Sequence, residues 1–159
     1  MEIRSIAPAD TVIMASIIRE VLTEFGANKP GFAWQDPELN DLYSAYDNVR
    51  EKYYVIESAG TIVGGCGLAE FICDLPLCCE FQKMYLLPHV RGKGLGLELI
   101  NTLLQSAEEF EYTNAYLETM GSMIQARKLY LASGFIALNS PLGSSGHNAC
   151  DAWYLKSLS

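Results

Sequence analysis

The sequence lacks any apolar run that approaches the about 18 residues needed to cross a bilayer. The best candidate, residues 59–69, is short and rich in glycine. Internal repeats, low-complexity tracts and linkers are also missing, so residues 1–159 are expected to form a single domain. Half of the residues are hydrophobic, which excludes a disordered chain, because such chains have too little apolar surface to offset their ordering entropy.

Basic residues are scarce, with 11 Lys and Arg against 19 Asp and Glu and a formal charge of −8. An acidic surface repels phosphate backbones, so we expect neither a nucleic-acid nor a membrane partner. The cysteines are odd in number, and no two have C-x-x-C spacing: Cys66, Cys73, Cys78, Cys79 and Cys150. They predict reduced thiols in a cytoplasmic protein without a metal site, and the early acid Glu2 argues against a secretory signal.

Hydrophobic spacing and turn residues predict the order βα(α)βββαβαββ, an α/β fold with one mixed sheet and helices packed on it. Strands are expected at residues 2–6, 52–58, 61–71, 80–87, 113–118, 135–138 and 149–155. Helices are expected at residues 8–25, 36–46, 95–110 and 122–134. Ser122 and Gln125 have the S-x-x-Q spacing of a capping box at the start of the last helix.

A glycine-rich loop between Pro88 and the helix at 95–110 is the most informative segment. Such a loop lets backbone N–H groups converge on an anion at a helix N-terminus, where the helix dipole also favours negative charge. No acid occurs from residue 81 to residue 97, whereas Lys83, Arg91 and Lys93 do. A basic island in an acidic chain favours a phosphate-bearing ligand over a glycine turn with solvated lysines.

Two common phosphate-binding motifs fit this loop poorly. A Walker A loop needs Ser or Thr after Gly-Lys, and Gly94 stands there instead. A Rossmann loop needs a third glycine where this chain has Leu97. Because Glu118 could take the place of the ribose-binding acid, a nucleotide-dependent oxidoreductase stays open as an alternative.

The pattern R-x-x-G-x-G at residues 91–96 resembles the acyl-CoA signature of the GNAT N-acetyltransferases. The pattern L-Y-x-x-x-G-F at residues 129–135 is similar to the family's second cofactor-side motif, and the element order matches along nearly the whole chain. The resemblance implies a GNAT-like acyl-CoA N-acyltransferase fold, with a mixed, mostly antiparallel sheet flanked by helices. One departure is Met123, where many members carry asparagine.

The resemblance also implies acetyl-CoA as the co-substrate. Glycine amides of the loop would hold its pyrophosphate, since a Cβ would block the approach, and Lys93 would meet an outer phosphate. The strand edge would pair with the pantetheine arm. The implied cofactor-binding residues are Met84, Leu86, Arg91, Gly92, Lys93, Gly94, Gly96 and Tyr130.

Amide formation from a thioester needs a proton acceptor for the amine, a donor for the oxyanion and a proton for the leaving thiolate. The family suggests the backbone N–H of Met84 as the oxyanion donor and Tyr130 as the acid. Glu80 lies eleven positions before Arg91, where the histone-acetylating branch has its base. Partial burial would raise the pKa of this glutamate, and His147 is the next candidate base.

Simple strand alternation would place four side chains on one face of the strand at 80–87: Glu80, Gln82, Met84 and Leu86. The sequence therefore predicts an N-acetyltransferase that moves an acetyl group to a primary amine of a small molecule or peptide by direct attack in a ternary complex. Acids such as Glu20, Glu24 or Glu70 could attract a cationic acceptor. The alternative is a non-catalytic acyl-CoA sensor on the same fold. The oligomeric state carries no signal in the sequence.

Overall fold

Seven strands form one sheet in the order β1-β2-β3-β4-β5-β7-β6 in the computed structural model, which describes residues 1–158. All neighbouring strands are antiparallel except β4 and β5, which are parallel. The strands are β1 Glu2–Ser5, β2 Lys52–Ser58, β3 Thr61–Glu70, β4 Cys78–Leu86, β5 Asn114–Thr119, β6 Ile136–Leu138 and β7 Ala152–Ser157. The prediction of a mixed, mostly antiparallel sheet is confirmed.

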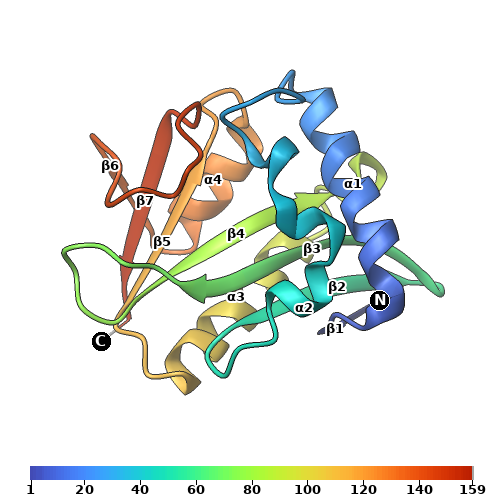
Figure 1. Ribbon diagram of the computed structural model, residues 1–159, viewed down its shortest axis with the longest axis horizontal. Coiled ribbons are helices and arrows are strands. Elements are labelled where there is room, and N and C mark those ends of the chain that lie inside the picture. Colours follow the sequence, from blue (N-terminus) through green and yellow to red (C-terminus); the bar gives the residue numbers. More distant parts are fainter. Residues whose placement is uncertain (159) are drawn as a thin grey trace.

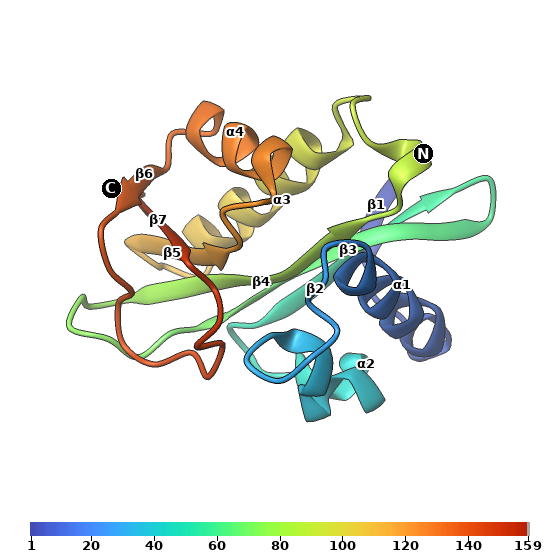
Figure 2. The same ribbon diagram turned by 90° about the horizontal axis from the view of Figure 1, so that it is seen from above.

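Helices cover both faces of the sheet, as Figure 2 shows from above. On one face lie α3 and α4, and on the other lie α1 and α2. Each face has its own apolar core, because the helical spacing of residues such as Ile18 in α1 and Leu99 in α3 turns one stripe toward the strands. The helices are α1 Thr11–Glu24, α2 Leu42–Ala45, α3 Leu95–Glu109 and α4 Ile124–Ala132.

The two parallel strands separate part-way along the sheet. Pairing between β4 and β5 joins residues 78–81 to residues 114–117. Beyond Phe81, β4 continues toward α1 while β5 rises toward α4, so the strands diverge as a V (Figure 1). The second half of β4 thus has β3 on one side and an open edge on the side where β5 would lie.

A β-bulge at Lys83 overturns the expected alternation along β4. Gly65 pairs with Tyr85 and Gly67 pairs with Gln82, so one β3 residue stands opposite two β4 residues. Lys83 has a φ of +52° there. Met84 and Leu86 consequently pack into the core beneath α3, whereas Gln82 contacts Tyr46 on the α1 side. The prediction that Glu80, Gln82, Met84 and Leu86 share one face is wrong for this reason.

Two further expectations about helices are also wrong. The helix expected at residues 36–46 is divided into a 3₁₀ turn, Pro37–Asn40, and the short α2. Asp41 lies between them in a non-helical conformation, and its carboxylate accepts a hydrogen bond from the Ser44 N–H (3.2 Å), which caps a new helix. The capping box at Ser122 does not form, because α4 begins one residue later and Met123 occupies its N-cap position.

Candidate active site

A groove of about 430 Å³ lies along the open edge of β4. Its walls come from α1, from the loop before α3 and from the first turns of α3 and α4. It contains seven of the eight predicted cofactor-binding residues, and Lys93 is exposed outside it. The lining residues are Val21, Phe25, Met84, Tyr85, Leu86, Arg91, Gly92, Gly94, Gly96, Leu97, Ser122, Met123, Ile124, Gln125, Ala126, Leu129 and Tyr130.

The loop glycines are required for two different reasons. Gly92 and Gly94 have φ values of +74° and +83°, which side chains of L-residues rarely adopt, and an added Cβ at either would enter open space. At Gly96 the backbone is helical, and a Cβ would lie 2.8 Å from Leu129 of α4. Gly96 therefore allows α3 to approach α4, whereas Gly92 and Gly94 shape the loop that presents the N-terminus of α3 to the groove.

Arg91 fastens this loop to the rest of the protein. Its Nε donates to the Leu86 carbonyl (2.9 Å), and its two terminal nitrogens donate to the Glu24 carboxylate at the end of α1 (2.8 Å each). This contact lowers the pKa of Glu24. The Arg91 N–H donates to the Pro88 carbonyl (3.3 Å), so this amide already has a partner within the loop. Glu24 thus helps to hold the loop that forms one wall of the groove.

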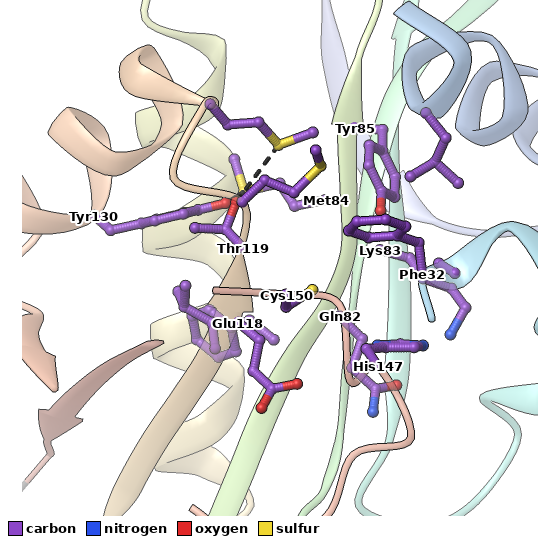
Figure 3. Close-up of a pocket in the computed structure, with 16 residues that line it drawn as sticks. Phe32, Gln82, Lys83, Met84, Tyr85, Glu118, Thr119, Tyr130, His147 and Cys150 are labelled. Carbon is purple, nitrogen blue, oxygen red and sulfur yellow. Dashed lines mark hydrogen bonds between the residues drawn. The ribbon is translucent and has the colours of Figure 1, made fainter. Parts of the chain in front are cut away.

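A smaller cavity of about 60 Å³ lies where β4 and β5 diverge (Figure 3). Four residues line both spaces, so the groove and this inner cavity adjoin at Met84, Tyr85, Met123 and Tyr130. The other lining residues of the inner cavity are Leu22, Phe32, Ala33, Phe81, Gln82, Lys83, Leu117, Glu118, Thr119, Met120, His147 and Cys150.

Tyr130 stands at the junction of the two spaces. Its ring packs against Phe135 and Tyr154, with centroids 6.4 and 5.7 Å away. Its hydroxyl donates to the Met84 Sδ over 3.8 Å, a weak contact that a better acceptor would replace. Burial raises the pKa of the Tyr130 phenol, so the group keeps its proton at neutral pH and can donate a hydrogen bond there.

Glu80 lies on the α1 side of β4 and is only 4% exposed. Burial raises its pKa from 4.5 to about 7, although the hydrogen bond from the Gln82 amide acts in the opposite direction. The Tyr46 hydroxyl donates to the Gln82 Oε1 (2.7 Å) and fixes that amide. Glu80 lines neither the groove nor the inner cavity, whereas Gln82, whose amide donates to the Glu80 carboxylate, lines the inner cavity.

Residues 16–135 match the model of the Acetyltransferase (GNAT) family. The chain belongs to the GNAT family. The N-acetyltransferase YjgM of Escherichia coli (strain K12) is 37% identical over 157 residues, covering 98% of this chain and 93% of that protein. The family assignment makes this GNAT protein an N-acetyltransferase and removes the oxidoreductase alternative that Glu118 had kept open.

Solved GNAT structures show the same fold at lower identity. An acetyltransferase of the GNAT family from Staphylococcus aureus Mu50 superposes with a TM-score of 0.86 at 21% identity, covering 99% of both chains. The protein yncA from Salmonella typhimurium, solved with its cofactor acetyl-CoA, has a TM-score of 0.78 at 18% identity and covers 100% of this chain. The match also covers 94% of the yncA chain. Because it spans 100% of this chain, the GNAT fold extends over the whole described sequence.

Met123, where the family resemblance predicts asparagine, lies at the start of α4 in this GNAT protein. The Met123 Sδ accepts a hydrogen bond from the Thr119 hydroxyl (3.4 Å). Its side chain lines both the groove and the inner cavity. A thioether thus lies at their junction, and the side-chain donors among the four shared residues are the Tyr85 and Tyr130 hydroxyls.

A charged cluster at the inner cavity was missed by the sequence analysis. Lys83 Nζ lies 2.8 Å from Asp36 Oδ2, and His147 Nε2 lies 3.0 and 2.8 Å from the two oxygens of the same carboxylate. Burial alone would raise the pKa of Asp36, but the His147 hydrogen bond and the Lys83 charge lower it. The Asp36 contact in turn raises the pKa of His147. No spacing signal connects positions 36, 83 and 147.

Glu118 belongs to the other side of the inner cavity. Its carboxylate accepts hydrogen bonds from the Tyr116 hydroxyl (2.6 Å) and from the Ser145 hydroxyl. The Ser145 oxygen also accepts the N–H of His147 (3.2 Å). These contacts hold the loop at residues 139–148 beside the cavity. Through Ser145, the position of His147 is therefore linked to that of Glu118.

The cysteines offer no nucleophile at this site. Burial raises the pKa of Cys79 and of Cys150 to about 12 each, so both remain thiols at neutral pH. Within residues 1–158, no group of three or more His, Cys, Asp or Glu side chains is placed to hold a metal ion. In the same part of the chain, no helix has the length and apolar character of a membrane span.

Proposed function

We propose that this protein transfers the acetyl group of acetyl-CoA to a primary amine of a small molecule or peptide, by direct attack within a ternary complex. One observation carries the proposal: the groove and the inner cavity adjoin at Met84 and Tyr130. A thioester held in the groove would place its carbonyl at this junction, and an amine in the inner cavity would approach from the opposite side.

Acetyl-CoA fits the groove by the chemistry of its walls. The loop at residues 91–96 and the first N–H groups of α3 form an anion site for the pyrophosphate. Lys93 is exposed beside the loop and is free to reach an outer phosphate. Met84 and Leu86 lie on the part of β4 that β5 leaves open, so that edge can pair with the amides of pantetheine.

The chemical step forms a C–N bond between amine and carbonyl carbon and breaks the C–S bond. The Met84 N–H donates to the oxyanion of the tetrahedral intermediate. Tyr130 donates a hydrogen bond to the sulfur as thiolate charge develops. Glu80 accepts the amine proton, since a pKa of about 7 leaves a substantial ionised fraction at neutral pH.

The proton reaches Glu80 through water, because the Glu80 carboxyl does not line the inner cavity and only its partner Gln82 does. His147 lines that cavity and is the second candidate base. The two assignments differ in what they predict for single variants. If Glu80 is the base, Glu80→Gln removes the pH dependence near 7. If the imidazole is the base, the pH dependence survives in Glu80→Gln and is lost in His147→Gln.

The test is a screen of primary amines and peptides with acetyl-CoA, following release of the CoA thiol and identifying products by mass spectrometry. We expect amine-dependent thiol release and an acetylated product for at least one acceptor. A reaction without amine gives the hydrolysis background. Thermal stabilisation by acetyl-CoA without turnover of any amine would instead favour a non-catalytic acyl-CoA sensor.

A further inference from the structure

The inner cavity carries a charge pattern that a simple amine would not need. Lys83, Glu118 and His147 are the lining residues with basic or acidic side chains, and the rest of the described lining is apolar, aromatic, amide, hydroxyl or thiol. Figure 3 shows Glu118 beside β5, with Lys83 and His147 across the cavity beside β4. The two sides therefore differ in charge.

Lys83 is buried to an unusual degree for a lysine. Its side chain is 4% exposed, and its partner Asp36 does not line the cavity. An ammonium has three N–H donors, and the contact to Asp36 occupies one of them. Lys83 lines the cavity whereas Asp36 does not, so the ion pair lies in the cavity wall and the remaining donors of the ammonium are available to a second anion.

His147 strengthens the positive side. Both of its contacts to Asp36 involve Nε2, and an imidazolium carries a second N–H at Nδ1. One carboxylate is thus shared between two basic groups. When His147 is protonated the three side chains carry a net charge of about +1, and the Asp36 contact favours that protonated form by raising the pKa of His147.

The bulge in β4 is what brings Lys83 to this place. Lys83 has a φ of +52°, a conformation that is strained for a residue other than glycine. The bulge sets the Lys83 side chain on the α1 side, next to the Met84 amide that is proposed to hold the oxyanion. An acceptor whose anionic group binds Lys83 would therefore lie in the inner cavity, which adjoins the groove at Met84.

Glu118 supplies the opposite charge. The Tyr116 and Ser145 hydroxyls fix its carboxylate, and a carboxylate has about four acceptor positions, so it can still receive an ammonium. We propose, resting on the proposed function, that the acceptor is a small amino acid whose carboxylate binds Lys83 and His147 while its amine lies between Glu118 and Met84.

This assignment narrows the acceptor class on physical grounds. A polyamine would bring positive charge toward Lys83 and leave that side without an anion. A peptide N-terminus has an amide where an amino acid has its carboxylate. The volume of about 60 Å³ further limits the group that enters. The acidic exterior alone would favour cations, so selection for a zwitterion has to arise inside the cavity.

The experiment compares three acceptors, each with a primary amine on the same carbon skeleton: an α-amino acid, its primary amide and its decarboxylated amine. We expect kcat/KM to be at least about tenfold higher for the acid. The amide loses its ammonium proton more readily than the acid, so intrinsic reactivity favours the amide. A preference for the acid therefore reports binding of the carboxylate.

The matched variants are Lys83→Met with Asp36→Asn, which remove both charges together and so avoid an unpaired buried carboxylate. We expect the double variant to raise KM for the acid about tenfold or more, so that the preference for the acid over the decarboxylated amine is lost. Lys52→Met on β2 lies outside both spaces and is the control for loss of a lysine.

Thermal stabilisation by acetyl-CoA, measured on each variant, shows that the fold and the groove are intact. Equal or better turnover of the amide or the decarboxylated amine by the wild type would overturn the inference and leave the proposed function standing. An acid preference that survives in the double variant would also overturn it. Absence of thiol release with every amine would overturn the proposed function itself, and the inference with it.

Discussion

At the scale of single residues, burial acts in the same direction on Glu80 and Tyr130 but gives them opposite roles. Both groups lie in places where the charged form is disfavoured. For Glu80, the pKa rises to about 7, which makes the carboxylate a stronger proton acceptor at neutral pH. For Tyr130, the pKa rises away from neutrality, so the phenol remains a hydrogen-bond donor.

We predict that Glu80→Gln lowers kcat/KM at neutral pH by about 100- to 10,000-fold, because the amide cannot accept the amine proton. The wild-type rate should rise with pH through about 7, as Glu80 ionises, and the variant should lack this rise. Its deficit should shrink at high pH, where more of the acceptor is already a neutral amine. The measurement is a pH profile of kcat/KM for both proteins.

Stability against pH provides the control for Glu80→Gln. Because the folded-state pKa is raised from 4.5 to about 7, the neutral carboxyl stabilises the fold below pH 4.5. This contribution, about 3 kcal/mol, is lost as the pH rises through 7. The glutamine of the variant does not titrate. The stability of the variant relative to the wild type should therefore increase as the pH rises from 4.5 to about 7. Wild-type kcat/KM in the variant would remove Glu80 as the base and leave His147.

We predict that Tyr130→Phe lowers kcat about tenfold and leaves acetyl-CoA affinity and Tm nearly unchanged. The lost hydrogen bond goes to a thioether at 3.8 Å, so its removal costs little stability. The hydroxyl matters when charge develops on the leaving sulfur, so the loss falls on the chemical step. Tm, acetyl-CoA Kd and kcat are measured on the same preparation.

Tyr154→Phe is the matched control for Tyr130→Phe. Tyr154 packs against Tyr130, lies outside both spaces and has a hydroxyl that accepts from Arg127 (2.9 Å). It should change stability and leave kcat alone. If Tyr130→Phe behaves in the same way, with a lower Tm and unchanged kcat, Tyr130 has only a packing role.

At the scale of elements, β4 organises the site by two local departures from regular pairing. The separation from β5 after Phe81 opens the groove edge and the inner cavity. The bulge at Lys83 turns Met84 toward the α3 side and leaves Glu80 and Gln82 on the α1 side. The proposed cofactor contacts and the proposed proton acceptor therefore come from one strand but face opposite sides of the sheet.

We predict that Gly94→Ala weakens acetyl-CoA binding at least about tenfold. Alanine disfavours the +83° φ, and its methyl would enter the groove beside the anion site. Gly60→Ala in the β2–β3 turn is the matched control, because Gly60 has a φ of +78° and similarly open surroundings. Each substitution should cost about 1 kcal/mol of stability.

Isothermal titration with acetyl-CoA distinguishes the two glycine variants. Only Gly94→Ala should lose affinity for acetyl-CoA. Both substitutions strain the backbone, but only Gly94 lines the groove. Equal affinity in Gly94→Ala and Gly60→Ala would show that the loop does not bind the pyrophosphate.

At the scale of the whole molecule, a chain of charge −8 presents a basic loop beside one groove. We predict that acetyl-CoA at about 100 times its Kd stabilises the protein by about 2.7 kcal/mol. For a domain of this size the Tm should rise by about 5–10 °C. NAD and ATP at the same concentration should give no comparable rise. Thermal shift assays measure all three, and a response to NAD without one to acetyl-CoA would contradict the proposed cofactor.

Local sequence determined most of the elements and the cofactor side of the site. Periodic apolar spacing specifies α1 and α3, because each needs only one stripe of neighbours three or four residues apart. The motif at residues 91–96 is contiguous, and its positive-φ glycines act within a single turn. For that reason the groove residues could be predicted before any packing was known.

Tertiary structure alone decided the acceptor side. The bulge arises from pairing between β3 and β4, so simple alternation placed Met84 and Glu80 on the same face. Asp36, Lys83 and His147 come from three distant segments, and their contact depends on how the loops pack across the sheet. Burial of Glu80, which sets its pKa, likewise comes from neighbours in space. Interactions between charges, and the pKa values that they shift, depend on distances in three dimensions. Spacing along the sequence does not give those distances.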